Sequence, residues 1–206
     1  MLISSRIGCV FVHVPKTAGS SIDRWLQTLD PSAVRILPHL RATYVPAKGK
    51  HLFASDLRAG LPRELWFGSF KFGFVRNPFD RLVSWYHMCL QRPDEEYRRY
   101  VIATTSCFED FVEKSDRFVG RAAMIGFNQV DHLCDAHGTP LVDFVGRFEN
   151  LPADVATVMA TLGVGGDVPR FNSSRHDTYR EYFSRSSVAV VEERFARDLE
   201  QFSYVF

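Results

Sequence analysis

An apolar run that leads through a short polar loop into an amphipathic segment constrains this chain most. The run IGCVFVHV, residues 7–14, is continuous and rich in β-branched side chains, which is typical of a buried strand in a parallel sheet. The loop PKTAGSS follows, and apolar residues then recur at helical spacing over residues 22–29. Ser20 or Ser21 is a suitable N-cap for that helix. The sequence therefore predicts a strand, a tight loop and a helix in direct succession.

A second stretch, FKFGFVRNPFDRLVSWYHMCLQR, repeats this order. Residues 70–75 are expected to form a strand, and Pro78 stands where the first turn of a helix tolerates proline. Such units around apolar strands are typical of an α/β sheet, whose ligands bind beyond the carboxyl ends of the strands. We expect a single α/β domain, residues 1–206, with helices flanking a mainly parallel central sheet.

Weaker patterns predict the remaining elements. A strand is expected within residues 33–38, and a hairpin or strand pair over residues 130–149 with its turn at Gly138. Helices are expected at residues 52–62, 95–102, 108–114, 151–162 and 187–202. The sequence contains no internal repeat and no linker that would divide the domain.

Composition limits the classes of function. Of the 206 residues 46% are hydrophobic, and 25 Lys and Arg against 24 Asp and Glu leave a net charge of +1. This composition indicates a packed globular protein without a global field that would attract nucleic acid or an anionic membrane surface. Any anion site must therefore be local.

The four cysteines lie far apart, without a CxxC pair or a histidine at metal-ligand spacing. We expect reduced thiols and no metal site. The apolar run over residues 7–14 is too short to span a membrane and does not lead into a signal-peptide cleavage site. These features favour a cytoplasmic protein, and they do not indicate an oligomeric state.

The first loop has the chemistry of a phosphate site. A turn from a strand into a helix N-terminus offers unbonded backbone N–H groups and the positive end of the helix dipole. Lys16 adds a cation, Gly19 is expected to let the backbone approach a ligand closely, and the hydroxyls of Thr17, Ser20 and Ser21 are expected to add donors. Taken alone, the same residues are equally consistent with a plain strand-to-helix turn that has a serine N-cap.

The loop differs from the P-loop of nucleoside triphosphatases. In GxxxxGK[ST] the lysine follows the second glycine, whereas Lys16 precedes Gly19 and no glycine opens the turn. No apolar strand ends in an aspartate suited to magnesium, because Asp143 falls inside its run. Metal-dependent phosphoryl transfer is therefore disfavoured.

The second strand end offers another anion site. Arg76 ends the strand and Ser84 lies on the following helix, so a guanidinium and a hydroxyl could bind one more phosphate. Asp80 and Arg81 are expected to form a solvent-facing or structural pair. An Arg-Asn-Pro strand end alone is more often a capped turn, but two such edges in one domain suit a ligand with two separated phosphate groups.

The segments HVPKTAGSS and FGFVRNPFDRLVSWY together resemble the two nucleotide-binding motifs of the sulfotransferases that use PAPS, 3'-phosphoadenosine 5'-phosphosulfate. The pattern is most similar to that of the Golgi carbohydrate sulfotransferases, particularly the uronyl 2-O-sulfotransferase-like branch and its short bacterial relatives. The resemblance implies that the first motif binds the 5'-phosphosulfate and that Arg76 and Ser84 bind the 3'-phosphate. The residues implied for the first motif are Pro15, Lys16, Thr17, Ala18, Gly19, Ser20 and Ser21.

Catalytic roles follow from the same resemblance. Lys16 is expected to neutralise charge on the departing phosphate, without a metal ion. An acceptor hydroxyl also needs a general base, and His51 matches the family's catalytic histidine in its order along the chain. A loop histidine that only caps or packs beside the next helix is the alternative reading of His51.

Other residues compete for the role of base. His87, one turn after Ser84, is the second choice, and Asp56 and Glu64 remain because the family sometimes uses a carboxylate. His13 is expected to be a core or supporting residue, and His39 has no motif around it. The remaining histidines are expected on the surface, in the hairpin or in a C-terminal loop: His132, His137 and His176.

The acceptor and the adenine site are less defined by the sequence. The polar stretch PRFNSSRHDTYR could close over the cofactor or be a solvated connector, and the aromatic residues Trp66, Phe70, Trp85 and Phe127 are core residues more often than adenine contacts. The predicted activity is sulfuryl transfer from PAPS to a hydroxyl or amine of a saccharide, lipid head group or small molecule. The alternatives are an ATP-dependent kinase with a related loop and a non-catalytic nucleotide-binding module.

Overall fold

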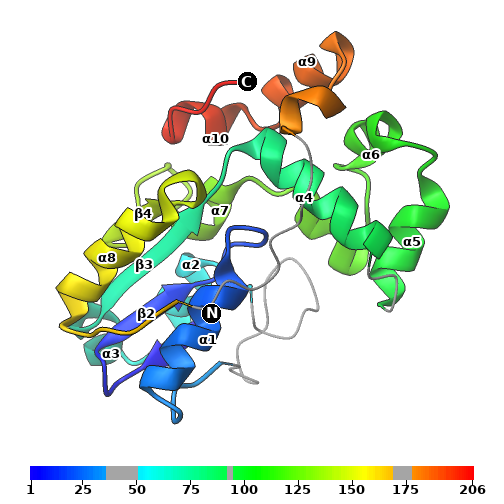
Figure 1. The fold of residues 1–206 in the computed structure, drawn as a ribbon. Coiled ribbons are helices and arrows are strands. Elements are labelled where there is room, and N and C mark those ends of the chain that lie inside the picture. The colour runs from blue at the N-terminus through cyan, green and yellow to red at the C-terminus, as the bar shows by residue number, and fades with distance from the viewer. Residues whose placement is uncertain (36–50, 92–94, 169–177) are drawn as a thin grey trace. The chain divides into compact units, whose positions relative to one another are not determined.

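The computed structural model describes residues 1–35, 51–91, 95–168 and 178–206, so half of the strand expected within residues 33–38 lies outside the described residues. These residues form two compact units, each built from separate stretches of the chain (Figure 1). We call them the sheet unit, with residues 1–35, 51–75 and 129–168, and the helical unit, with residues 76–91, 95–128 and 178–206.

The sheet unit contains four strands in the order β1-β2-β3-β4. Their bounds are Leu2–Ser4 for β1, Cys9–Val12 for β2, Phe70–Val75 for β3 and Phe144–Arg147 for β4. The three strands β2, β3 and β4 are parallel, and β1 pairs antiparallel with β2 at the edge. The expected mainly parallel α/β sheet is therefore confirmed, and β3 has the bounds that the sequence predicted.

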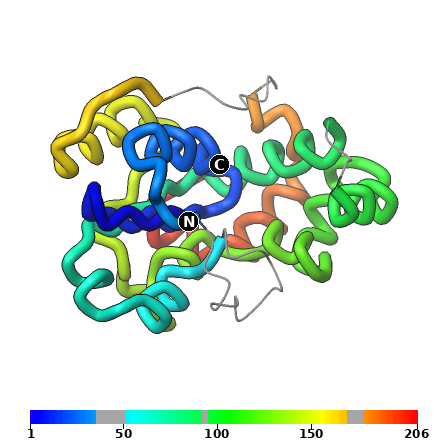
Figure 2. Tube along the Cα trace, turned by 90° about the horizontal axis from the view of Figure 1, so that it is seen from below, coloured from blue at the N-terminus to red at the C-terminus, as the bar shows by residue number. Residues whose placement is uncertain are grey.

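Helices cover both faces of this sheet. Figure 2 shows α1 and α8 on one side of the strands and α2, α3 and α7 on the other. Their bounds are Gly19–Leu29 for α1, Ala54–Gly60 for α2, Arg63–Gly68 for α3, Gln129–Leu133 for α7 and Leu151–Leu162 for α8. The helices expected at residues 22–29, 52–62 and 151–162 are thus present, and α3 is an additional one.

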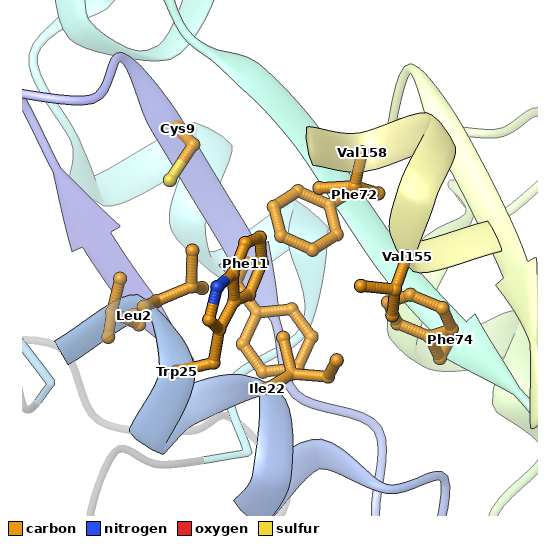
Figure 3. Packing of buried hydrophobic residues seen from close by; sticks show 10 residues of the cluster. Leu2, Cys9, Phe11, Ile22, Trp25, Phe72, Phe74, Val155 and Val158 are labelled. Carbon is orange, nitrogen blue, oxygen red and sulfur yellow. The ribbon is translucent and has the colours of Figure 1, made fainter. Parts of the chain in front are cut away.

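The main core lies between the sheet and the helices α1 and α8, and it contains side chains from one face of the strands. Every second strand residue faces these helices, which is the two-residue period of a strand. Phe11 packs against Phe72 with ring centroids 5.3 Å apart (Figure 3). The fully or nearly buried members of this cluster are Leu2, Cys9, Phe11, Ile22, Trp25, Leu26, Phe72, Phe74, Val155 and Val158.

Close packing on the opposite face depends on Gly73. A Cβ atom at this position would lie 2.5 Å from a methyl carbon of Leu133 on α7. Burial on both faces explains why β2 and β3 are continuous apolar runs rather than alternating ones.

The helical unit follows β3 along the chain and is held by aromatic packing. Its helices are α4 (Pro78–Gln91), α5 (Glu96–Thr104), α6 (Phe108–Lys114), α9 (Arg185–Arg194) and α10 (Ala196–Gln201), with short 3₁₀ segments at Gly120–Ile125 and Tyr179–Tyr182. Phe79 on α4 contacts the rings of Phe183 and Phe206 at centroid distances of 5.3 Å and 4.8 Å. Among the described residues no helix is long and apolar enough to cross a membrane.

Two sequence expectations were wrong in part. Residues 130–149 contain α7 and β4, and the antiparallel pairing expected around Gly138 is limited to one bridge between Cys134 and Pro140, because β4 pairs with β3 in parallel. Gly138 occupies the turn with a φ of 82°. The helix expected at residues 187–202 is divided into α9 and α10 at Phe195, whose buried ring lies 5.3 Å from the Arg81 guanidinium.

Candidate functional site

The loop between β2 and α1 has an unusual backbone. Lys16 and Ala18 adopt the left-handed conformation, with φ values of 69° and 64°, although neither is glycine. Such a conformation is costly for residues with a side chain and is concentrated at functional sites. The backbone thus supports a binding role for this loop over a plain turn.

Unbonded amides line the start of α1. Among the described residues, the backbone N–H groups of Thr17, Ala18, Gly19 and Ser20 make no hydrogen bond of good geometry. Consecutive amides around left-handed residues form a concave anion site, and the helix dipole adds to it. The arrangement fits a phosphate or sulfate group.

The helix cap differs from the expected one. Ala18 is the N-cap of α1 and its carbonyl accepts hydrogen bonds from the amides of Ser21 and Ile22, whereas Ser20 and Ser21 lie inside the first turn. Neither serine is therefore the N-cap. The exposed hydroxyl of Ser20 remains available to a ligand at this end of the helix.

Thr17 has a structural contact. Its hydroxyl donates to the carbonyl oxygen of Val14 at 3.0 Å, and the residue is completely buried. In this structure the hydroxyl proton closes the loop, which the sequence did not predict, and a contact between this hydroxyl and the ligand stays a prediction. The backbone amide of Thr17 is a further candidate donor to the ligand.

Gly19 serves a neighbouring side chain. A Cβ atom at Gly19 would lie 2.1 Å from two atoms of the His13 imidazole ring, Cδ2 and Nε2. The absence of a side chain at Gly19 therefore makes room for the His13 ring, a role that the sequence did not predict; the close approach of the Gly19 backbone to a ligand stays a prediction. The buried His13 ring also stacks on Phe11 at a centroid distance of 5.5 Å.

His51 lies beside the same residue. Its Nδ1 atom is 2.8 Å from the His13 carbonyl oxygen, and the two imidazole rings meet edge to face at a centroid distance of 4.5 Å. A carbonyl oxygen can only accept a hydrogen bond, so Nδ1 carries the proton and Nε2 of the neutral ring is an acceptor. This is the tautomer that a base acting through Nε2 requires.

The second predicted motif belongs to the helical unit. Arg76 follows directly after β3 along the chain, is 5% exposed, and its Nε donates to the Asp80 carboxylate at 2.7 Å. Ser84 lies on α4, is 4% exposed, and its hydroxyl makes no hydrogen bond among the described residues. Lys16 of the first motif and the predicted base His51 belong to the sheet unit.

Arg81 is buried rather than solvent-facing. Its side chain donates to the carbonyl oxygen of Phe127, and its guanidinium lies over the Phe195 ring. Asp80 forms an ion pair with Arg76. A long cationic side chain thus helps to hold the helical unit together.

The rival bases have other contacts. Asp56 accepts a hydrogen bond from the Phe53 amide at 3.1 Å and so caps α2, and Glu64 is exposed in the first turn of α3. His87 Nε2 lies 2.8 Å from the Tyr182 hydroxyl. His132 is buried against Phe53 rather than on the surface.

Several candidates remain without a ligand role. Trp66 and Trp85 are buried core residues, and His137 is exposed in the turn that contains Gly138. His39 and the polar stretch over residues 170–176 lie outside the described residues, as does nearly all of the loop at residues 43–51.

The sequence did not indicate the contacts of two residues near the predicted motifs, Asn77 and His13. Asn77 accepts a hydrogen bond from the Phe79 amide at 3.0 Å and donates to the Val205 carbonyl oxygen at 2.9 Å, so it shapes the turn after Arg76. Asparagine before Pro78 is a capping signal that could have indicated this. His13 was placed in the core correctly, but nothing in the sequence shows its contact with His51.

The described residues contain no group of three or more side chains that could hold a metal ion. Asp143, the aspartate considered for magnesium, forms an ion pair with Lys71 at 2.9 Å. The loop amides and the second motif are donors rather than metal ligands, which fits a phosphorylated ligand.

Comparison with known proteins identifies the family. Residues 1–205 match the sulfotransferase family. Mouse carbohydrate sulfotransferase 12 is 23% identical over 205 residues, which covers 80% of this chain and 48% of the mouse protein, so the chain spans about half the length of that relative. An uncharacterised protein from Archaeoglobus fulgidus is 28% identical over 126 residues, 61% of this chain and 94% of the archaeal protein.

Structural similarity agrees with this assignment. The crystal structure of mouse sulfotransferase SULT7A1 complexed with PAP matches with a TM-score of 0.56 at 14% identity, covering 98% of this chain and 91% of that chain. At this identity the match shows a shared fold. Because the family match extends over nearly the whole sequence, this chain belongs to the sulfotransferase family.

Proposed function

We propose that the protein transfers a sulfuryl group from PAPS to a hydroxyl or amine of a small molecule, a lipid head group or a saccharide. The observation that carries this proposal is the 2.8 Å contact between His51 Nδ1 and the His13 carbonyl oxygen. This contact joins a histidine with an accepting Nε2 to His13, two residues before the loop PKTAGSS at residues 15–21, which we call the anion loop. Family membership supplies the reaction class.

The donor is bound by residues of both motifs in this proposal. The amides of residues 17–20 and the Lys16 ammonium take the 5'-phosphosulfate, in accord with the left-handed loop and its unbonded N–H groups. Arg76 and Ser84 take the 3'-phosphate. The buried guanidinium of Arg76 is already oriented by Asp80, so little side-chain entropy is lost when it binds.

The reaction is a direct transfer between two oxygens. The bond between sulfur and the 5'-phosphate oxygen breaks while a bond between sulfur and the acceptor oxygen forms. The electron pair of the broken bond stays on the phosphate of PAP, 3'-phosphoadenosine 5'-phosphate, where Lys16 and the loop amides balance the charge. The acceptor proton passes to His51 Nε2.

His51 is favoured over its rivals because of what the others already bind. The Asp56 carboxylate caps α2, and the Nε2 atom of His87 contacts the Tyr182 hydroxyl. The contact between Nδ1 and the His13 carbonyl oxygen orients the His51 ring and gives Nε2 of the neutral ring the role of acceptor. The protonated ring keeps its bond to the His13 carbonyl, which is stronger for a charged donor.

Turnover of labelled PAPS against a panel of phenols, alcohols, amines and saccharides tests the proposal directly. We expect sulfated product and PAP without added metal ions. Equal stabilisation by ATP with magnesium and none by PAP would reject the donor assignment. PAP binding without turnover on any acceptor would leave a nucleotide-binding module as the function.

Two substitutions separate the catalytic roles. Lys16→Ala should lower turnover strongly even with a saturating, easily ionised acceptor, because the leaving phosphate loses its counter-charge. His51→Ala should lower turnover about 10²–10⁴-fold on an aliphatic alcohol and less on an acidic phenol, which ionises without a base. His137→Ala, an exposed histidine of the Gly138 turn, is the matched control and should retain activity. Full activity of His51→Ala on the alcohol would reject His51 as the base.

A further inference from the structure

His13 contacts both the anion loop and the proposed base His51, which belong to the sheet unit. Its ring is 97% buried and is bounded by Phe11, by Gly19 at the start of α1 and by the His51 ring. The backbone carbonyl of the same residue accepts the Nδ1 proton of His51. One residue therefore contacts the anion loop through its ring and the base through both its ring and its backbone.

The His13 ring packs directly on the backbone of Gly19. Three ring atoms, Cδ2, Nε2 and Cε1, lie within 2.1–2.9 Å of the position that a Cβ atom of Gly19 would take. The ring therefore fills the space that a side chain at this position would need. Because protein interiors are closely packed, we expect a shift of α1 at Gly19 to displace the His13 ring as well.

We propose that His13 is a positioning residue that holds the general base in register with the anion loop. This inference rests on the proposed function, because it concerns the alignment of His51 with the sulfuryl group bound at residues 16–20. The His13 ring packs edge to face with the His51 imidazole and holds it in the position where the His13 carbonyl accepts the Nδ1 proton. Neither group touches the reacting atoms.

The tautomer of His51 can be measured without any substrate. Nitrogen-15 chemical shifts of histidine rings distinguish a proton on Nδ1 from one on Nε2. In the wild-type protein we expect neutral His51 to carry its proton on Nδ1. In His13→Leu the carbonyl remains but the supporting ring is lost, so we expect a mixture of tautomers for His51. His13→Phe, which keeps a flat ring against Phe11 and His51, should restore the Nδ1 form.

Kinetics gives the second readout. A misplaced base should slow the sulfation of an alcohol more than that of an acidic phenol, because the phenol ionises without a base. His13→Leu should therefore lower kcat about 10–100-fold on 1-butanol and by less on 4-nitrophenol. A variant that merely loosens the fold would slow both acceptors alike. The affinity for PAP, measured by calorimetry, should change much less than kcat.

Substitution at Gly19 tests the contact from the other side and remains informative if His13→Leu does not fold. Gly19→Ala should lower the melting temperature by about 2–12 °C, since the added methyl group meets the ring. Adding His13→Ala to Gly19→Ala should remove that extra loss, because the two effects share one contact. Gly68→Ala is the matched control, since a Cβ atom there meets nothing within 4 Å.

The outcomes separate this inference from the proposed function. Absence of PAP binding and turnover in the wild-type protein rejects the function, whereas the tautomer and melting measurements still test the contacts of His13. If His51 keeps a pure Nδ1 proton in His13→Leu and both acceptors slow equally, His13 is only a packing residue. Additive losses in the Gly19 and His13 variants would likewise overturn the proposed coupling.

Discussion

Replacing Thr17 with valine tests whether the closure of the anion loop depends on one hydroxyl. Valine has nearly the shape of threonine but cannot donate to the Val14 carbonyl, which the hydroxyl contacts at 3.0 Å in a completely buried position. An unsatisfied buried acceptor costs about 1–3 kcal/mol. For a chain of this size each kcal/mol lowers the melting temperature by about 2–4 °C, so we expect a loss of about 2–12 °C.

Thermal unfolding without nucleotide is the decisive assay. Thr17→Ser is the control, because it keeps the hydrogen bond and loses a single methyl group, worth about 0.8 kcal/mol. Thr17→Val should also weaken PAP binding, since the amides that follow lose their fixed geometry, whereas Thr17→Ser should not. If Thr17→Val binds PAP poorly but is as stable as the wild type, the hydroxyl serves the ligand and our structural assignment is refuted.

Four further results are expected. PAP at 100 times its dissociation constant should stabilise the protein by about 2.7 kcal/mol without magnesium, a rise of about 5–11 °C in melting temperature; a rise that needs metal would contradict the donor assignment. Arg76→Ala and Ser84→Ala should weaken PAP binding in calorimetry more than they slow single turnovers at saturating PAPS, and the reverse pattern would assign them to chemistry. Burial raises the pKa of the Cys9 thiol to about 12, so stability that the neutral thiol contributes below pH 9 should be lost as the pH rises towards 12, and Cys9→Ala should show a smaller alkaline loss. At pH 8 the exposed Cys107 should therefore be alkylated before Cys9, and mass spectrometry of the labelled peptides checks the order.

The local patterns predicted those parts of the fold that depend on neighbouring residues. The apolar run before the loop, the strand at residues 70–75 and the helix at residues 151–162 were all found where their periodicity indicated. Such segments have one consistent local preference that packing reinforces. The family resemblance, which rests on two short motifs, was confirmed over residues 1–205.

Contacts between distant residues could not be predicted in the same way. The space above Gly19 is filled by His13, and the guanidinium of Arg81 is buried under Phe195, yet neither partner is marked by spacing along the chain. The hairpin expected around Gly138 is reduced to one antiparallel bridge, because β4 pairs with β3, more than 60 residues earlier, instead of with its neighbour in sequence. Non-local pairing decides between alternatives that local propensity leaves equal.

The left-handed backbone at Ala18 also affects how the loop tolerates substitution. This conformation costs about 1–2 kcal/mol for an L-residue with a side chain, and glycine in its place would add about 0.4–1 kcal/mol of unfolded-state entropy, so Ala18→Gly could raise stability by up to about 1.5 kcal/mol. A chain optimised for stability alone would carry glycine here. Alanine at this position therefore marks a place where the fold gives up stability, which is typical of binding sites.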